Sequence, residues 1–129
     1  MTLVDTSIWI EVFRKRRTLD IEAIVPLDEV ATCLPVIQEV LQGFAAETAY
    51  RIARDSLFDL AVLDDPIDAG LVEDAVALYR AARRQGLTVR SSVDCLIAAT
   101  ALRHDVEVLH RDRDFAALAR VSALRQREP

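Results

Sequence analysis

The sequence predicts an α/β fold, a sandwich of helices around a mostly parallel sheet, and three observations support this prediction. Short apolar runs typical of buried strands alternate with longer segments of helical periodicity. This alternation is typical of parallel sheets, because their strands are joined by helical crossovers. With 129 residues, 52% of them hydrophobic, and only three glycines and four prolines, the chain should form one ordered domain over residues 1–129.

The first predicted unit is a strand followed directly by a helix. Residues 2–5 (TLVD) form a short apolar run that ends at an acid. Residues 6–15 then place apolar side chains at helical spacing, and either Thr6 or Ser7 is a suitable N-cap. We expect the basic cluster Arg14–Arg17 to close this helix and to lead into a loop.

A second strand and helix follow, and a further helix extends this unit. Residues 30–33 (VATC) predict a short strand. Residues 34–44 predict a helix, with Pro35 at its start, where proline is tolerated, and Gly43 at its stop. Residues 45–60 are again amphipathic and predict another helix.

The third unit joins a strand to the longest predicted helix. Residues 61–64 (AVLD) predict a strand, and the turn signal Asp65-Pro66 follows it. Residues 67–85 predict a long amphipathic helix that stops before Gly86. Its apolar side chains are expected along one face: Leu71, Val72, Ala75, Val76 and Tyr79.

The end of the chain predicts a helix, a strand and a final helical turn. Ser91 and Ser92 are good N-cap residues for a helix over residues 93–104. Residues 106–110 (VEVLH) alternate in character as a strand does. Asp112 begins a last turn that leads into the segment FAALARV.

Charge is distributed unevenly along the chain. The net charge is −5, but residues 1–78 hold six basic and fifteen acidic side chains, whereas residues 79–129 hold ten basic and six acidic ones. Fifteen of the sixteen basic residues are arginine, whose planar guanidinium suits phosphate. The second region is therefore a candidate phosphate-binding surface, although a solvated basic face would give the same pattern.

The sequence gives no sign of a membrane or secretory protein. No apolar run reaches the roughly 18 residues of a membrane span. The N-terminus lacks the basic region of a signal peptide, and Asp5 interrupts its apolar stretch. We therefore expect a cytoplasmic protein in which Cys33 and Cys95 are free thiols.

Five acidic residues stand at positions that suggest one common site. Asp5 ends the first predicted strand, and Asp112 and Asp114 follow the last one. Asp94 lies in the first turn of a helix, and Glu39 lies within an apolar helical segment. Carboxyl ends of parallel strands and the starts of the adjoining helices face one edge of a sheet, where ligands of such folds bind. The sequence thus predicts a carboxylate cluster at that edge.

A cluster of this kind needs a cation or protons to offset its charge. Mg²⁺ and Mn²⁺ prefer carboxylate oxygens, whereas the two histidines of the chain form no zinc pattern. The acids also have structural interpretations: Asp5 and Asp112 as helix caps, Asp94 as a partner of the helix dipole, and Glu39 as a surface residue. These alternatives stay open for each residue taken alone.

Four motifs resemble those of the PIN-domain ribonucleases and, more closely, of the VapC toxins of bacterial type II toxin–antitoxin pairs. They are LVDTSIWIEVF, the glutamate of PVIQEVLQG, VRSSVDCLIAATALRH and VLHRDRDF, in this order over nearly the whole chain. The resemblance implies a PIN-like three-layer α/β/α sandwich and a Mg²⁺- or Mn²⁺-dependent endoribonuclease. It also implies tRNA or rRNA as substrate, a cognate VapB-type antitoxin, a homodimer, and a heterotetramer or larger assembly with the antitoxin.

The resemblance also assigns roles to individual residues. It implies that Asp5, Asp94 and Asp112 hold the metal ion and that Glu39 and Asp114 support them in catalysis. Auxiliary polar residues are expected at the edge of the site: Thr6, Ser7 and Ser91. Six arginines are candidates for binding RNA phosphates: Arg80, Arg83, Arg84, Arg90, Arg111 and Arg113.

Two other protein classes fit these residues less well. A phosphatase of the haloacid dehalogenase type would need a second aspartate where the chain has Ser7, and its lysine does not match Lys15. A receiver domain would likewise need a lysine near its last strands. Two further alternatives have the same fold but another function. One is a non-catalytic PIN module that binds metal or antitoxin, and the other is a PIN nuclease that processes RNA.

Overall fold

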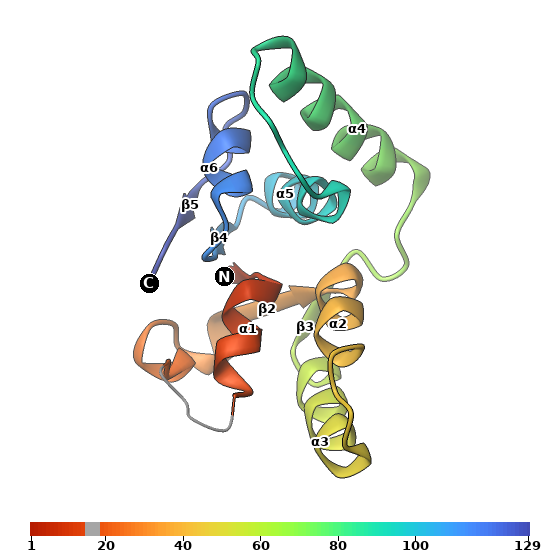
Figure 1. The fold of residues 1–129 in the computed structure, drawn as a ribbon, viewed down its shortest axis with the longest axis vertical. Helices are drawn as coiled ribbons and strands as arrows, with labels where there is room; N and C mark the ends of the chain where they lie inside the picture. The colour runs from red at the N-terminus through yellow and green to blue at the C-terminus, as the bar shows by residue number, and fades with distance from the viewer. Residues whose placement is uncertain (15–18) are drawn as a thin grey trace.

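In the computed structural model, which describes residues 1–14 and 19–129, a central sheet lies between two layers of helices (Figure 1). Within these residues the sheet has five strands in the order β3-β2-β1-β4-β5, and every neighbouring pair is parallel. The strands are β1 (Thr2–Val4), β2 (Val30–Cys33), β3 (Ala61–Leu63), β4 (Glu107–Leu109) and β5 (Gln126–Arg127). The predicted α/β sandwich around a parallel sheet is confirmed.

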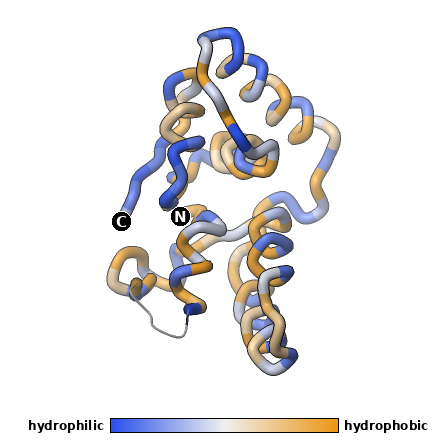
Figure 2. Tube along the Cα trace, in the orientation of Figure 1, coloured by the Kyte–Doolittle hydropathy of each residue, from blue (hydrophilic) through white to orange (hydrophobic). Residues whose placement is uncertain are grey.

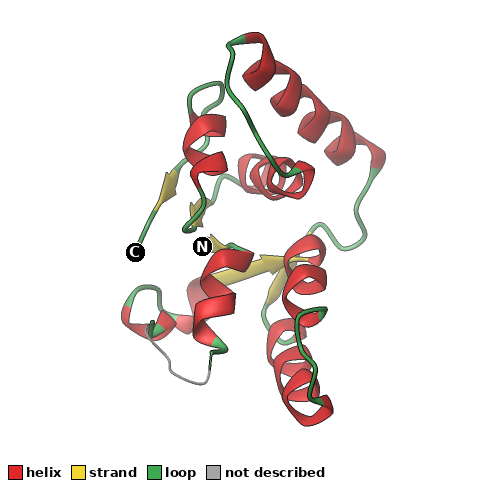
Figure 3. Cartoon of the chain, viewed as in Figure 1, coloured by secondary structure: helices red, strands yellow, loops and turns green. Residues whose placement is uncertain are grey.

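Three helices cover each face of the sheet (Figure 3). One layer consists of α1 (Thr6–Val12), α2 (Leu34–Leu41) and α3 (Glu47–Phe58). The other consists of α4 (Ala69–Arg84), α5 (Ser92–His104) and α6 (Arg113–Ala119). Two short 3₁₀ turns, Ile21–Ala23 and Leu27–Glu29, precede β2. The chain builds β1, β2 and β3 outward in one direction and then adds β4 on the other side of β1, so the strand order reverses between β1 and β4.

Some observed helix bounds differ from the predicted ones, and a capping residue explains one of these differences. The long helix begins at Ala69 rather than at residue 67, because the side chain of Asp68 caps it by accepting from the Leu71 N–H at 2.8 Å. The first helix ends at Val12 rather than at residue 15. Residues 15–18 lie outside the described part of the chain, and with them Lys15 and most of the predicted Arg14–Arg17 loop.

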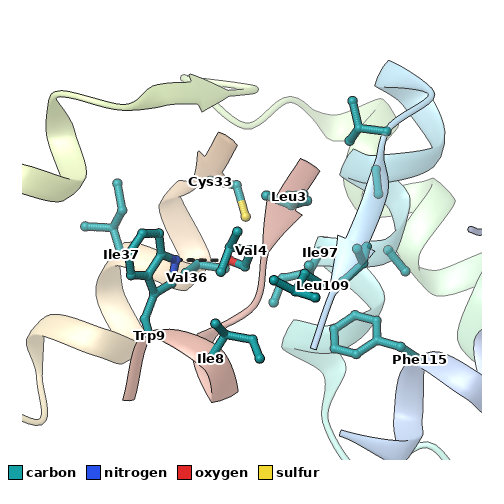
Figure 4. Packing of buried hydrophobic residues seen from close by; sticks show 14 of the residues in the cluster. Leu3, Val4, Ile8, Trp9, Cys33, Val36, Ile37, Ile97, Leu109 and Phe115 are labelled. Atoms are coloured by element: carbon teal, nitrogen blue, oxygen red, sulfur yellow. Dashed lines mark hydrogen bonds between the residues drawn. The ribbon is translucent and has the colours of Figure 1, made fainter. Parts of the chain in front are cut away.

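The main core lies between β1, β4 and the helices on both sides (Figure 4). Leu3, Val4 and Leu109 are fully buried on the two central strands. The indole of Trp9 lies against this core and donates from Nε1 to the Val4 carbonyl at 3.2 Å. This bond ties α1 to the strand before it, and thereby fixes the turn at Asp5 that joins them.

The predicted apolar face of the long helix is only partly buried. Leu71, Ala75, Leu78 and Ala82 form the buried stripe of α4, whereas Val72, Val76 and Tyr79 are exposed. The two sets lie on neighbouring stripes of one helix, about 100° apart, and only the first faces the core. Figure 2 shows the resulting alternation of hydrophobic and hydrophilic residues along α4.

Two expectations about the chain as a whole can be compared with the described residues. Cys33 and Cys95 are both buried, and neither forms a disulfide within the part of the chain that the structure describes, as predicted. Among the described helices, none has the length and apolar character that crossing a membrane requires.

Candidate metal centre

The strand order brings the predicted acids to one place. β1 and β4 are parallel neighbours, so the residues after Val4 and Leu109 meet at the same edge of the sheet. The Asp5 N–H donates to the Leu109 carbonyl at 2.9 Å and joins these two strand ends. Ligands of open parallel sheets bind at the carboxyl ends of the strands, at the point where the strand order reverses. Asp5 and Asp112 flank that point.

One carboxylate oxygen of Asp5 caps a helix, and the other accepts no hydrogen bond from the described residues. Its Oδ2 accepts from the Ser7 N–H at 3.0 Å and from the Ser7 hydroxyl at 2.5 Å, which caps α1. Oδ1 is buried and has no hydrogen-bond partner among residues 1–14 and 19–129. The capping and ligand interpretations of this residue are therefore compatible.

In Asp114, too, one carboxylate oxygen accepts hydrogen bonds from the described residues and the other does not. Its Oδ2 accepts from the backbone N–H groups of Arg90 and Ser91, each at 3.1 Å. These bonds tie the start of α6 to the loop that enters α5. Its Oδ1 is buried and unpartnered as far as the described residues reach.

Asp94 and Asp112 complete the group. Asp94 lies in the first turn of α5 with only 5% of its surface exposed, and its Oδ2 finds no hydrogen-bond partner within the described chain. Asp112 is half-buried and caps α6, because its Oδ1 accepts from the Asp114 N–H at 2.9 Å. Asp94, Asp112 and Asp114 each offer one oxygen that lies within 4.8 Å of the other two.

Burial and mutual repulsion raise the pKa of two of these carboxyls. The pKa of Asp94 is well above the ordinary value, first because burial desolvates the charge, and then through its contact with Asp114 and the nearby charge of Asp5. Burial also raises the pKa of Asp5, although hydrogen bonds from Ser7 oppose the rise. Without a counter-charge, the site thus favours retained protons.

These features fit a hard divalent cation. Three buried carboxylate oxygens, Asp5 Oδ1, Asp94 Oδ2 and Asp114 Oδ1, accept no hydrogen bond from any described residue. Buried polar atoms normally have hydrogen-bond partners, and carboxylate oxygens are preferred ligands of Mg²⁺ and Mn²⁺. Asp5 is not one of the three residues in closest mutual reach, but its charge acts on Asp94, and the charge of Asp112 acts on it.

Glu39 reaches the edge of this group from α2. It is half-buried, and its Oε1 accepts from the Thr6 hydroxyl at 2.8 Å. Thr6 follows Asp5 directly, so the glutamate lies beside the first acid rather than within the cluster formed by Asp94, Asp112 and Asp114.

The predicted serines make different contacts. Ser7 bridges two segments, because its hydroxyl donates to Asp5 and accepts from the Arg111 N–H at 2.9 Å. Ser91 is the N-cap residue of α5, but its side chain makes no cap bond, and its N–H donates to Asp114 instead.

The six candidate arginines are all exposed, and they form two groups. Arg90 precedes α5 and Arg111 and Arg113 flank Asp112, so these three border the acidic cluster. Arg80, Arg83 and Arg84 lie in the last turns of α4, and Figure 1 places that end of the helix at the top of the molecule, apart from α1. The loop of residues 85–91 leads from the second group towards the cluster, and Arg90 lies near its end.

Two residues beside the cluster have contacts that sequence reasoning missed. The sequence identifies His110 only as a structural residue and gives no role to Gln126. In the structure His110 accepts from the Asp112 N–H and contacts the Gln126 side chain. The position of His110 directly before the acids was the available signal, whereas Gln126 carries none.

Comparisons with known proteins identify relatives of the whole chain. The sequence matches the profile of the PIN domain over residues 2–121. It is 41% identical over 135 aligned residues to VapC ribonuclease Mb1587 of Mycobacterium bovis and to ribonuclease VapC11 of Mycobacterium tuberculosis, and each alignment covers 96% of this chain and 96% of the relative. A chain of the crystal structure of VapBC-5, a member of the VapBC family of toxin–antitoxin systems from Mycobacterium tuberculosis, superposes with a TM-score of 0.73 at 28% identity, covering 99% of this chain and 98% of that chain.

Proposed function

Because the chain belongs to the PIN domain family and resembles VapC ribonucleases over nearly its full length, we propose that it is a Mg²⁺- or Mn²⁺-dependent endoribonuclease. We further propose that it acts as the toxin of a VapBC module. The single observation that carries the metal dependence is the group of three buried, unpartnered carboxylate oxygens of Asp5, Asp94 and Asp114 within the described chain.

In this proposal Asp5, Asp94 and Asp112 hold the ion, and Glu39 and Asp114 support them. A bound Mg²⁺ or Mn²⁺ would lower the pKa of a water molecule and stabilise negative charge on the phosphate. Asp114 keeps the loop before α5 in place through Arg90 and Ser91. Ser7 holds Asp5 by its hydroxyl and its N–H. Hydrolysis by water leaves a 5′-phosphate and a 3′-hydroxyl.

Electrostatics explain how an acidic protein can act on RNA. The charge of −5 includes the acids of the cluster, and a divalent ion would offset part of it. Arg90, Arg111 and Arg113 border the cluster, so they are the candidates for contacts to flanking phosphates. Arg80, Arg83 and Arg84 would reach only a longer RNA.

The proposed partners follow from the relatives. VapBC-5 is described as a member of a family of toxin–antitoxin systems, which supports a cognate VapB-type antitoxin for this chain. We also propose a cytoplasmic location, a homodimer, a heterotetramer or larger assembly with the antitoxin, and a structured RNA such as tRNA or rRNA as the substrate.

Expression in a bacterial host without the antitoxin tests the toxin role. The intact protein should arrest growth, and Asp5→Asn and Asp94→Asn should each relieve the arrest at equal protein levels. Asp55→Asn is the matched control, because Asp55 lies exposed on α3 away from the cluster, and it should remain toxic. Full toxicity of both site variants would contradict the proposal.

The two alternatives that keep the fold give other results. A non-catalytic PIN module would bind metal or antitoxin but leave RNA intact in the presence of Mn²⁺. A nuclease of RNA processing would cleave RNA without arresting growth. The presence of all five acids, Asp5, Glu39, Asp94, Asp112 and Asp114, favours the catalytic interpretation.

A further inference from the structure

The imidazole of His110 lies buried directly behind the acidic cluster, with 1% of the residue exposed. It follows β4 and packs against the ring of Phe115, with ring centroids 4.9 Å apart. Nδ1 lies 3.0 Å from the backbone nitrogen of Asp112, and Nε2 lies 2.5 Å from Gln126 Oε1 on β5. Both ring nitrogens therefore have a partner inside the fold.

These contacts determine the tautomer of the ring. A backbone N–H can only donate, so Nδ1 must present its lone pair to Asp112. In a neutral imidazole the proton then resides on Nε2, which donates to the Gln126 oxygen. The fixed backbone donor sets this assignment, and the orientation of the glutamine amide follows from it. Because both nitrogens are engaged, His110 has no lone pair left to bind an ion.

The ring is held from β5 by several contacts. The His110 N–H donates to the Arg127 carbonyl at 3.1 Å. Two ion pairs fasten β5 to the β4 region: Arg127 to Glu107 at 2.6 Å and Arg125 to Asp105 at 3.2 Å. Gln126 stands between these two arginines in the sequence, so the ion pairs on either side of it hold its backbone next to the imidazole.

A continuous series of hydrogen bonds then leads from β5 to the start of α5. Gln126 orients His110, and His110 holds the Asp112 N–H. Asp112 Oδ1 accepts from the Asp114 N–H, and Asp114 Oδ2 accepts from the loop before Asp94. Partners of this kind, one contact removed from a metal, orient the ligands.

We propose that His110 is a positioning residue for the metal ligand Asp112, and that Gln126 holds the ring in place by accepting from Nε2–H. This inference rests on the proposed metal site, because a positioning role requires a ligand to position. The role lies in the acceptor at Nδ1 rather than in the ring as such. An asparagine places Oδ1 close to the position of Nδ1 and accepts readily from the N–H two residues on.

The main experiment compares Mn²⁺ affinity by calorimetry in the wild type, His110→Leu and His110→Asn. We expect His110→Leu to weaken binding about tenfold or more, which is the usual effect of removing such a partner. His110→Asn should restore affinity to within about threefold of the wild type, although it also removes the ring. Metal-free melting curves and circular dichroism establish that each variant is folded.

Nuclear magnetic resonance gives a test that needs neither metal nor activity. Long-range ¹H–¹⁵N spectra of the metal-free wild type should show His110 with a bare Nδ1 and a protonated Nε2. In Gln126→Leu the Nδ1 lone pair should still face the Asp112 N–H, but Nε2–H loses its acceptor, so its proton should exchange faster with solvent. A proton on Nδ1 in the wild type would overturn the inference, even if the leucine variant failed to fold.

The outcomes separate the two proposals. If the wild type binds Mn²⁺ and folded His110→Leu binds it equally well, the positioning role is wrong and the metal site stands. If His110→Asn binds as poorly as His110→Leu, the acceptor is not what matters, and the inference is also wrong. If the wild type binds no Mn²⁺ or Mg²⁺, both proposals are overturned.

Discussion

At the scale of single residues, the acids of the cluster divide their oxygens between folding and the site. Asp5 and Asp114 each use Oδ2 to hold backbone or hydroxyl donors and leave Oδ1 without a partner among the described residues. Asp112 uses Oδ1 to cap α6. From the sequence, an aspartate such as Asp5 can be interpreted either as a helix cap or as a metal ligand. In the structure these two roles fall to different oxygens of one side chain.

The first prediction concerns Asp94, whose pKa is raised by burial and by neighbouring carboxylates. The metal-free folded state keeps its proton at pH values where the unfolded chain has released it. The stability that protonated Asp94 contributes to the folded state is therefore fully present at pH values below the ordinary carboxyl pKa. This stability is lost as the pH rises towards the raised pKa of Asp94. At pH 7, Asp94→Asn should increase the metal-free free energy of unfolding by about 1 kcal/mol or more, the equivalent of one pKa unit.

Thermal unfolding in EDTA at pH 5 and pH 7 measures this effect. The melting temperature of Asp94→Asn at pH 7 should exceed that of the wild type by roughly 4 °C or more, and the difference should shrink at pH 5. Asp55→Asn, at an exposed position, should change neither value. A destabilised Asp94→Asn at pH 7 would contradict the electrostatic account.

The second prediction concerns Ser7, which donates to Asp5 and accepts from the Arg111 N–H. In Ser7→Ala the loss of the hydroxyl removes a contact that lowers the pKa of Asp5. We expect Mn²⁺ affinity at pH 7 to fall by about three- to tenfold in calorimetry. Ser56→Ala is the control, since Ser56 is exposed on α3 and its hydroxyl donates to the Ile52 carbonyl of the same helix. Equal loss in both variants would contradict a specific role for Ser7.

At the scale of elements, strong periodicity and capping residues account for what the sequence predicts. The predicted strands and helices from residue 2 to Asp112 all occur, because their apolar spacing agrees with the fold, and Asp5 and Asp68 also cap their helices. β5 was missed, since its two residues, Gln126 and Arg127, have no apolar alternation. Its stability comes from pairing with β4 and from ion pairs to residues distant in sequence, which no local pattern reveals.

The candidate site shows the same limit. The positions of Asp5, Asp94 and Asp112 at strand ends and a helix start predicted that they would meet at one edge. The partners of each acid could not be predicted, because the contacts of Asp114 with Arg90 and of Thr6 with Glu39 join segments far apart in the chain. Such contacts depend on how the crossovers return to the sheet.

The third prediction concerns β5 as an element. A chain that ends at Arg125 loses Gln126 and the ladder that holds His110. Its Mn²⁺ affinity should fall about tenfold or more, together with its melting temperature. A chain that ends at Arg127 is the matched control, because it keeps both residues of β5, and it should bind Mn²⁺ nearly as well as the wild type. An unchanged affinity in the shortened chain would show that β5 has no role in the site.

At the scale of the whole molecule, the structure shows where the basic region of the sequence lies. The basic region, residues 79–129, supplies the end of α4, all of α5 and α6 and the loops on either side of β4, and these three helices lie on one side of the sheet. Only Arg90, Arg111 and Arg113 lie next to the acids, whereas Arg80, Arg83 and Arg84 lie at the far end of α4. The two groups carry equal charge, so they can be compared directly.

The fourth prediction uses these groups as matched triple variants with arginine replaced by glutamine. Loss of Arg90, Arg111 and Arg113 should raise KM for a short RNA by about tenfold and weaken its dependence on salt, since fewer phosphates are neutralised. Loss of Arg80, Arg83 and Arg84 should change KM by less than about threefold. Equal effects of the two triples would mean that general charge, rather than position, attracts RNA.

The central claim is that the clustered carboxylates make this chain a metal-dependent hydrolase of RNA. Incubating the purified protein with total RNA and sequencing the cleaved ends tests it most directly, with Mg²⁺ or Mn²⁺ in one arm and EDTA in the other. The account predicts cleavage at few sites in the metal arm only, with 5′-phosphate and 3′-hydroxyl ends, and none with Asp94→Asn. Cleavage that persists in EDTA, or ends that carry a 2′,3′-cyclic phosphate, would contradict it.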